Sequence, residues 1–260
     1  MAVLRGRGDG GFDAAVTYVV GAMPQNVVVA DINNDGKPDI LTENTNSNSI
    51  SVLLGNGDGT FVSAVPYDLG FSPMNLALGD IDGDGNLDVF VSANSPLASF
   101  ALLQGFGDGR FGIAHYNGAG GSLYFGIAVA DLDGDDRLDV ALLDSPGSKI
   151  DVYYGEGGGF FENVIEVPTD ANSSSVAAAD LFGDGHVELL TAGENGVRLF
   201  ESRRDGTFRD AGALPGVAGG ANIAIADIDG NGSPDIVSPS YLTAQSTALL
   251  NQTILRGGFE

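Results

Sequence analysis

Short apolar runs alternate with polar or glycine-rich turns along the whole chain, and the same order of runs returns about every 50 residues. One unit consists of apolar runs at 25–30, 40–42, 50–54 and 61–67, separated by an acidic loop at 31–39, a polar turn and a glycine-rich turn at 55–59. Runs of this length, rich in Val and Ile and bounded by turn residues, predict β-strands. No segment has a sustained 3.6-residue apolar period, so we expect almost no helix.

Four antiparallel strands per repeat, set around an axis, are typical of a β-propeller. We therefore predict an all-β fold: one propeller domain over residues 1–260, with five blades of four antiparallel strands. The expected repeats are 25–73, 74–123, 124–173, 174–220 and 221–251, with residues 1–20 completing the last blade. A β-sandwich is the alternative, but a sandwich gives no reason for a period of about 50 residues.

The first strand of each repeat alternates small and large residues, as in Leu76, Ala77, Leu78 and Gly79. Period two places the small set on one face of the sheet and the large set on the other. Such an alternation would let crowded inner strands of neighbouring blades mesh.

The two ends of the chain suggest how the ring closes. Residues 3–12 match residues 52–61, so the chain starts at the third strand of a blade and continues into a fourth strand at 12–19. The fifth repeat lacks its own fourth strand, and we expect 12–19 to supply it by pairing with 247–251, which removes an open sheet edge. Because Val3–Arg5 and Thr247–Leu250 both correspond to a third strand, the alternative is that the chain is part of a larger propeller.

A ten-residue acidic phrase follows the first strand of every repeat, at 31–40, 80–89, 131–140, 180–189 and 227–236. Its spacing, Asp-x-Asp-x-Asp-Gly-x-x-Asp, wraps alternate side chains around one point, with Gly at the sharp turn. Ca²⁺ takes six to eight oxygen ligands from carboxylates, amides and backbone carbonyls. The phrase therefore predicts calcium loops in which position seven offers its carbonyl and position nine closes the site.

Four loops have a full set of predicted ligands. These are Asp31, Asn33, Asp35, Lys37 and Asp39 in the first; Asp80, Asp82, Asp84, Asn86 and Asp88 in the second; Asp131, Asp133, Asp135, Arg137 and Asp139 in the third; and Asp227, Asp229, Asn231, Ser233 and Asp235 in the fifth. The alternative for each is an acidic Asx-turn without metal, but several uncompensated carboxylates so close together would repel one another. Magnesium fits less well, because it resists sites made only of protein ligands.

Two loops depart from the pattern. The third has Asp136 where the others have Gly, and Asp tolerates the left-handed conformation that this position requires. The fourth has Phe182 in place of a ligand oxygen and Glu188 in the closing position. Its remaining candidate ligands, Asp180, Asp184, His186 and Glu188, form a weaker site.

The composition excludes several classes of function. The chain has a net charge of −24, so we expect neither nucleic acid nor anionic lipid as a partner. It has no Cys, which excludes disulfides, thiolate metal sites and a Cys nucleophile. No apolar run is long enough to insert into a membrane. Eleven Lys and Arg, none in a recognisable motif, make an enzyme the weakest interpretation, and we expect a non-enzymatic monomer.

The acidic phrases, together with Val52-Leu-Leu-Gly-Asn-Gly-Asp-Gly-Thr-Phe61, resemble the FG-GAP and VCBS repeat family of integrin-α-like β-propellers over essentially the whole chain. The resemblance implies structural calcium in the loop between the first and second strands. It also implies an extracellular or cell-surface location, with any secretion signal outside this chain. Members of the family serve in adhesion, in sugar binding and as accessory domains of secreted enzymes, so the resemblance names a scaffold and no single activity.

We expect a partner, protein or glycan, to bind on the face opposite the calcium loops, where the segments leading into the first strands differ among repeats. Met74, Tyr124 and Phe125 would form an apolar patch there, with packing between blades as the alternative explanation. Our first hypothesis is a calcium-stabilised scaffold that presents a binding surface. The alternatives are a carbohydrate-binding, lectin-like module and an accessory domain of a secreted polysaccharide-active enzyme.

Overall fold

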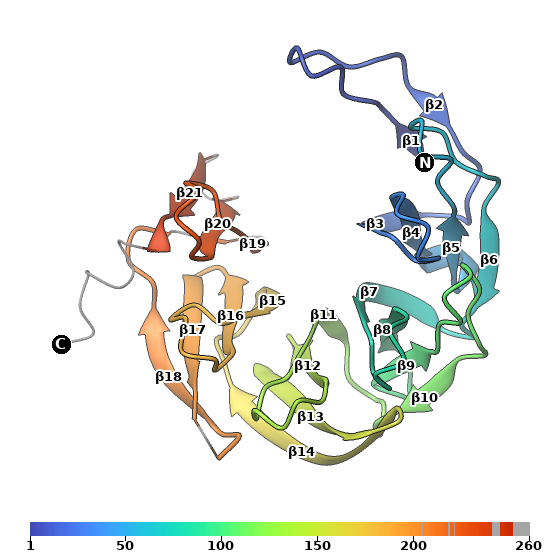
Figure 1. Ribbon diagram of the computed structural model, residues 1–260. Coiled ribbons are helices and arrows are strands. Elements are labelled where there is room, and N and C mark those ends of the chain that lie inside the picture. Colours follow the sequence, from blue (N-terminus) through green and yellow to red (C-terminus); the bar gives the residue numbers. More distant parts are fainter. Residues whose placement is uncertain (204, 218, 221, 241–244, 252–260) are drawn as a thin grey trace. The chain divides into compact units, whose positions relative to one another are not determined.

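The structure is a computed structural model that describes residues 1–203, 205–217, 219–220, 222–240 and 245–251, without the side chains of residues 162, 163 and 245. Within these residues the chain is built from antiparallel β-sheets (Figure 1). It divides into two compact units, Met1–Gly121 and Ser122–Glu260. Residues 204, 218, 221, 241–244 and 252–260, which the predicted domain includes, lie outside the described residues. No described helix is long and apolar enough to cross a membrane.

The first unit contains a hairpin and two four-stranded sheets. The hairpin pairs β1 (Ala2–Val3) with β2 (Val16–Thr17). The first sheet contains β3 (Pro24–Ala30), β4 (Asp39–Asn44), β5 (Ser49–Leu53) and β6 (Val65–Asp68), with the short 3-10 helix η1 (Thr45–Ser47) between β4 and β5. The second contains β7 (Ser72–Gly79), β8 (Asp88–Asn94), β9 (Phe100–Leu103) and β10 (His115–Asn117). Each strand pairs with its neighbour in sequence, so both sheets are simple meanders.

The second unit repeats this plan. Its sheets contain β11 (Tyr124–Ala130), β12 (Asp139–Asp144), β13 (Lys149–Gly157) and β14 (Phe160–Pro168); then β15 (Ser173–Ala179), β16 (Glu188–Gly193), β17 (Gly196–Ser202) and β18 (Phe208–Ala213); and finally β19 (Ala224–Ala226), β20 (Asp235–Ser240) and β21 (Gln245–Leu249). The last sheet is described with three strands.

Apolar seams join neighbouring sheets within each unit. In the first, Leu41, Ile50 and Val52 belong to one buried cluster with Val89 and Val91 of the following sheet. In the second, one cluster joins β11–β14 to β15–β18, and another joins β15–β18 to β19–β21. Sheets that pack face to face in sequence order are the blades of a propeller.

The prediction of an all-β propeller with five blades is confirmed: four blades have four described strands, and the fifth is β19–β21. The predicted start of the fourth strand at Phe61 is early, since the ladder of β6 begins at Val65. Phe61 makes only an isolated bridge to Gly55, while the Asn56 N–H donates to the Thr60 carbonyl at 2.9 Å and closes the tight turn. The predicted pairing of 12–19 with 247–251 would join the two units. The predicted single domain would also include both units, and both statements stay predictions.

Candidate metal centres

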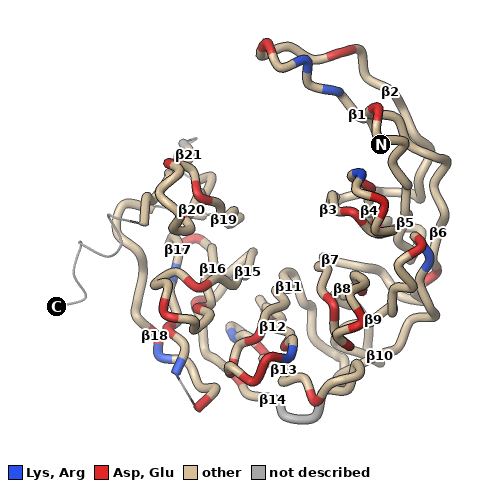
Figure 2. The backbone as a smooth tube through the Cα atoms, viewed as in Figure 1, with Lys and Arg blue, Asp and Glu red and all other residues tan. Residues whose placement is uncertain are grey.

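The five acidic loops connect the first strand of each blade to the second. They span residues 31–38, 80–87, 131–138, 180–187 and 227–234. Figure 2 shows acidic residues at these connections in the tube of the backbone. In the second loop, the Asp80 carboxylate accepts hydrogen bonds from the backbone N–H groups of Gly83, Asp84 and Gly85 at 2.8–3.1 Å. These hydrogen bonds fold the loop around the carboxylate of its first acid.

The sixth position of the loops needs a left-handed backbone. Gly85 has φ +86°, and Asp136, the single non-glycine residue at this position, has φ +65°. The Asp136 N–H still donates to Asp131 Oδ2 at 2.8 Å. The third loop therefore keeps the conformation of the others.

The acid at position nine is buried and anchors the loop to its blade. Asp88 is fully buried, and its two oxygens accept from the backbone N–H groups of Ile81 at 2.8 Å and Gly105 at 2.7 Å. The same pair of hydrogen bonds is made by Asp39, Asp139 and Asp235, with Asn251 in the place of the glycine for Asp235. Because each carboxylate oxygen has two lone-pair sites, these acids can still bind a cation.

Sequence reasoning missed the role of the glycine at the start of the glycine-rich turn. A side chain on Gly105 would overlap the carbonyl oxygen of Leu87, so only glycine lets this backbone approach the closing acid. Gly55 and Gly155 have the same close contact with the carbonyls of Pro38 and Leu138. The signal in the sequence was the return of this glycine in three repeats.

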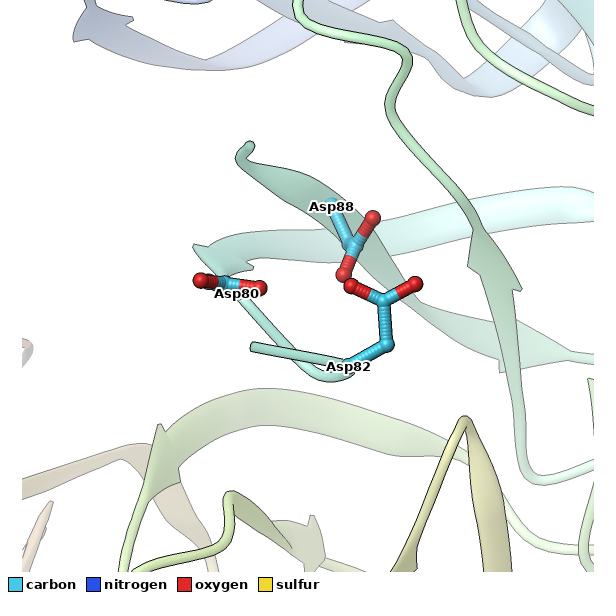
Figure 3. A group of neighbouring side chains, drawn as sticks. All are labelled: Asp80, Asp82 and Asp88. Carbon is cyan, nitrogen blue, oxygen red and sulfur yellow. The ribbon is translucent and has the colours of Figure 1, made fainter. Parts of the chain in front are cut away.

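Positions one, three and nine come together in three loops. The groups are Asp80, Asp82 and Asp88; Asp131, Asp133 and Asp139; and Asp227, Asp229 and Asp235. In each group, one ligand atom per residue lies within 4.8 Å of the others. Figure 3 shows Asp82 and Asp88 with their carboxylates close together and Asp80 across the loop from them. This is the arrangement that the Asp-x-Asp spacing predicted.

In the second and third loops the electrostatics of the acidic group favour a cation. Burial, reinforced by the charges of Asp82 and Asp80, raises the pKa of Asp88. Burial and the neighbouring Asp133 and Asp135 raise the pKa of Asp139 to about 7. A divalent ion would replace this mutual repulsion with attraction, and hard oxygen donors are what Ca²⁺ prefers. The residues present therefore fit calcium.

The acid at position five faces a different partner. Asp35, Asp84 and Asp135 each accept a hydrogen bond from the backbone N–H of position seven at 2.8–3.0 Å. Their second oxygens accept from the side chains of Lys37, Asn86 and Arg137 at 2.9–3.3 Å. In the first loop, the hydrogen bond from Lys37 lowers the pKa of Asp35. The structure does not bring position five into the acidic groups, although the sequence predicted it as a ligand.

The first and fifth loops contain amide side chains among their predicted ligands. Asn33 Oδ1 accepts from the Asp35 N–H at 3.2 Å, and Asn231 Oδ1 accepts from the Ser233 N–H at 2.7 Å. In both loops the first acid accepts from the backbone N–H groups of positions five and six, as in the others, and the loop has one fewer charge.

The fourth loop keeps the fold of the others and lacks one of their oxygens. Asp180 accepts from three backbone N–H groups, and the His186 N–H donates to Asp184 Oδ1 at 3.0 Å. Phe182 is half-buried and packs against the apolar cluster of its blade. Burial raises the pKa of Glu188 to about 7. The loop is thus held in part by an apolar contact where the others have a carboxylate.

The residues predicted for the opposite face have mixed exposure. Tyr124 is 3% exposed, and its hydroxyl donates to Asp151 Oδ2 at 2.8 Å, so it does not offer a ring to solvent. Phe125 is 38% exposed, and Met74 is half-buried. Met74 lies in the first unit and the other two in the second, so a common patch stays a prediction.

The sequence profile described as FG-GAP-like repeat matches residues 1–42, 44–91, 137–191 and 180–238. No curated protein matches the chain by sequence.

Three solved structures show the range of proteins with a similar fold. One is an Agrocybe aegerita lectin whose structure concerns specific recognition of non-reducing terminal N-acetylglucosamine. It has a TM-score of 0.64 and 23% sequence identity, and the alignment covers 99% of this chain and 76% of the lectin. BBS1N, solved in complex with ARL6DN, has a TM-score of 0.59 and 14% identity, covering 92% and 68%. A streptogramin B lyase has a TM-score of 0.54 and 15% identity, covering 89% and 70%. At these identities the likeness shows the fold alone.

Proposed function

The chain belongs to the FG-GAP-like repeat family, and we propose that it is a calcium-stabilised propeller scaffold that presents a binding surface to a protein or glycan partner. The observation that carries the proposal is that the acids at positions one, three and nine come together in three loops, and that the acid at position nine is buried in each. Bound calcium would neutralise these carboxylates and tie the first strand of a blade to the second.

The ion would act on stability. An ion that binds the native fold and not the unfolded chain stabilises the fold by RT ln(1 + [L]/Kd), which is about 4 kcal/mol for a site at a thousandfold excess over Kd. Several such sites in one chain would make the propeller dependent on calcium. We propose an extracellular or cell-surface location for such a scaffold, as the FG-GAP-like repeats suggest.

Elemental analysis of the purified chain tests the calcium proposal directly. We expect four ions per chain, in the first, second, third and fifth loops. We also expect excess chelator to lower the melting temperature and added calcium to restore it. The proposal is contradicted if the chain retains no calcium after dialysis in calcium buffer and its melting temperature is the same with and without chelator.

A carbohydrate-binding, lectin-like module is the second candidate. It is favoured by the likeness to the Agrocybe aegerita lectin, which spans 99% of this chain. A streptogramin B lyase has a similar fold, so one architecture serves different chemistries. We propose a non-enzymatic role. A glycan array read in calcium and again in chelator separates the candidates: reproducible, calcium-dependent binding supports a lectin, and its absence supports a protein partner.

A further inference from the structure

One hydrogen bond connects the first calcium loop to the second. Asn34 Nδ2 donates to Asn86 Oδ1 at 2.8 Å, across 52 positions of sequence. Asn34 lies in the loop between β3 and β4, and Asn86 lies in the loop between β7 and β8, both in the first unit. We name this contact the amide bridge.

Asn34 is unusual for its position in the loop. The other four loops have glycine at the fourth position, each with a positive φ: Gly83, Gly134, Gly183 and Gly230, at +73°, +82°, +68° and +74°. Asn34 adopts the same left-handed conformation, with φ +57°. A side chain there costs some conformational energy, and Asn tolerates it better than most residues. What the side chain adds is the amide bridge.

Asn86 is held from both ends of its side-chain amide. Its Oδ1 accepts from Asn34, and its Nδ2 donates to Asp84 Oδ2 at 2.9 Å. The first and third loops have Lys37 and Arg137 at this position, and each forms its own ion pair with the acid at position five. In the second loop a neutral amide takes this role, and its orientation depends on the neighbouring loop.

The glycine-rich turn of the second blade packs over the amide bridge. A side chain on Gly107 would overlap Asn86 Oδ1 and would come within 3.1 Å of Asn34 Nδ2. The bridge therefore lies where two loops and a turn meet, and glycine at 107 leaves space for the Asn86 side chain.

We infer that the amide bridge couples calcium binding in the first and second loops, so that an ion in either loop raises the affinity of the other. The inference rests on the proposed calcium function and concerns positioning residues. The backbone carbonyl of Asn86 is a predicted calcium ligand, and the bridge holds the residue that carries it. An ion that orders the first loop fixes Asn34, which fixes Asn86 for the second ion. Coupling of this kind is reciprocal.

The test is a calcium titration by isothermal calorimetry on the full chain, with Asp131→Asn and Asp227→Asn present to weaken the third and fifth loops. Asn34→Gly introduces the residue that the other loops have and keeps the left-handed backbone. We expect cooperative binding of two ions in this background. With Asn34→Gly added, we expect independent binding and a second step weakened about fivefold, which is the lower end of common coupling factors. The single variant Asn34→Gly, titrated in the otherwise unchanged chain, gives a second measurement if the background variant folds poorly.

Asn56→Ala is the matched control. It removes another exposed Asn amide, which bonds Thr60 Oγ1 at 2.9 Å within a glycine-rich turn, and it should leave the cooperativity unchanged. Equal cooperativity in Asn34→Gly and its parent overturns the amide-bridge inference and leaves the calcium function standing. A parent that binds no calcium overturns both. A loss of cooperativity in Asn56→Ala equal to that in Asn34→Gly also overturns the inference, because the effect would then not belong to the bridge.

Discussion

The backbone N–H of Phe111 donates to the hydroxyl of Tyr67 at 3.3 Å, and the two rings meet edge to face with their centroids 5.6 Å apart. The residues are 44 positions apart, on the outer strand of one blade and after the glycine-rich turn of the next. Tyr18 and Phe61 repeat the relationship, with a 3.1 Å hydrogen bond and centroids 5.7 Å apart. The N-terminal hairpin is therefore held to the first blade as that blade is held to the second.

Phe111→Ala should destabilise the fold by about 3–5 kcal/mol, because the ring is 6% exposed and its loss leaves a cavity. Tyr67→Phe should cost only about 0.5–1.5 kcal/mol, since it removes one hydrogen bond and keeps the ring contact. Chemical denaturation in saturating calcium measures both. Phe106→Ala, at a side chain that is 55% exposed, is the control and should change little. A Phe111→Ala variant as stable as that control would argue against the contact.

Substitutions of Asp133 and Asp139 should distinguish the contribution of bound calcium to stability from that of the loop's own hydrogen bonds. In calcium, Asp133→Asn should weaken the third site and lower the melting temperature. In chelator it should leave stability unchanged or raise it, because repulsion within the acidic group falls.

Asp139→Ala should destabilise with or without calcium, by about 2–4 kcal/mol in chelator, because the N–H groups of Leu132 and Gly155 lose their acceptor. Thermal melts of both variants, with and without chelator, make the comparison. Two variants with the same loss in chelator would contradict the separate roles.

Glu43 should make stability depend on pH near neutrality. It is fully buried, its Oε1 accepts from Asn26 Nδ2 at 2.9 Å, and its Oε2 has no hydrogen-bond partner among the described residues. Burial raises the pKa of Glu43 from 4.5 to about 7. The native state therefore holds a proton that the unfolded chain releases between these values. This contribution to stability is full below pH 4.5 and is lost as the pH rises through 7.

Glu43→Gln should remove this dependence and stabilise the fold by about 1–3 kcal/mol at pH 8 relative to its parent. Denaturation curves at pH 5 and pH 8 in saturating calcium give the difference, with the exposed Glu194→Gln as the control. An unchanged slope with pH would show that Glu43 is not the group that titrates.

Phe182→Asp should turn the fourth loop into a calcium site. The change supplies the missing oxygen at position three, and elemental analysis should find one more ion per chain than in the parent. The loss of the apolar contact should cost about 1–2 kcal/mol in chelator. Phe182→Leu is the control, with no gain of calcium. If Phe182→Asp gains no ion and Glu188→Asp added to it does, the length of Glu188 is the obstacle.

The repeating pattern of the sequence was sufficient to predict the strands and the blades. The alternation of apolar runs predicted the strands, and the period predicted the blades. The spacing of the acids predicted that positions one, three and nine meet, as they do in three loops, but it also predicted position five, which does not join them. The sequence was also insufficient at positions where the repeats depart from one another. Tyr124 was expected at an exposed face, but its hydroxyl bonds to the buried Asp151, which belongs to a different strand of the same blade.

The sequence by itself therefore determines the strands and the acidic loops, because strand periodicity and loop spacing depend on residues a few positions apart. Contacts between blades were decided only by the tertiary structure: the Asn34–Asn86 bridge and the Tyr67–Phe111 contact. Each depends on which side chains face one another across a seam, about one repeat apart in the chain. Packing sets that register, and no short-range pattern in the sequence encodes it.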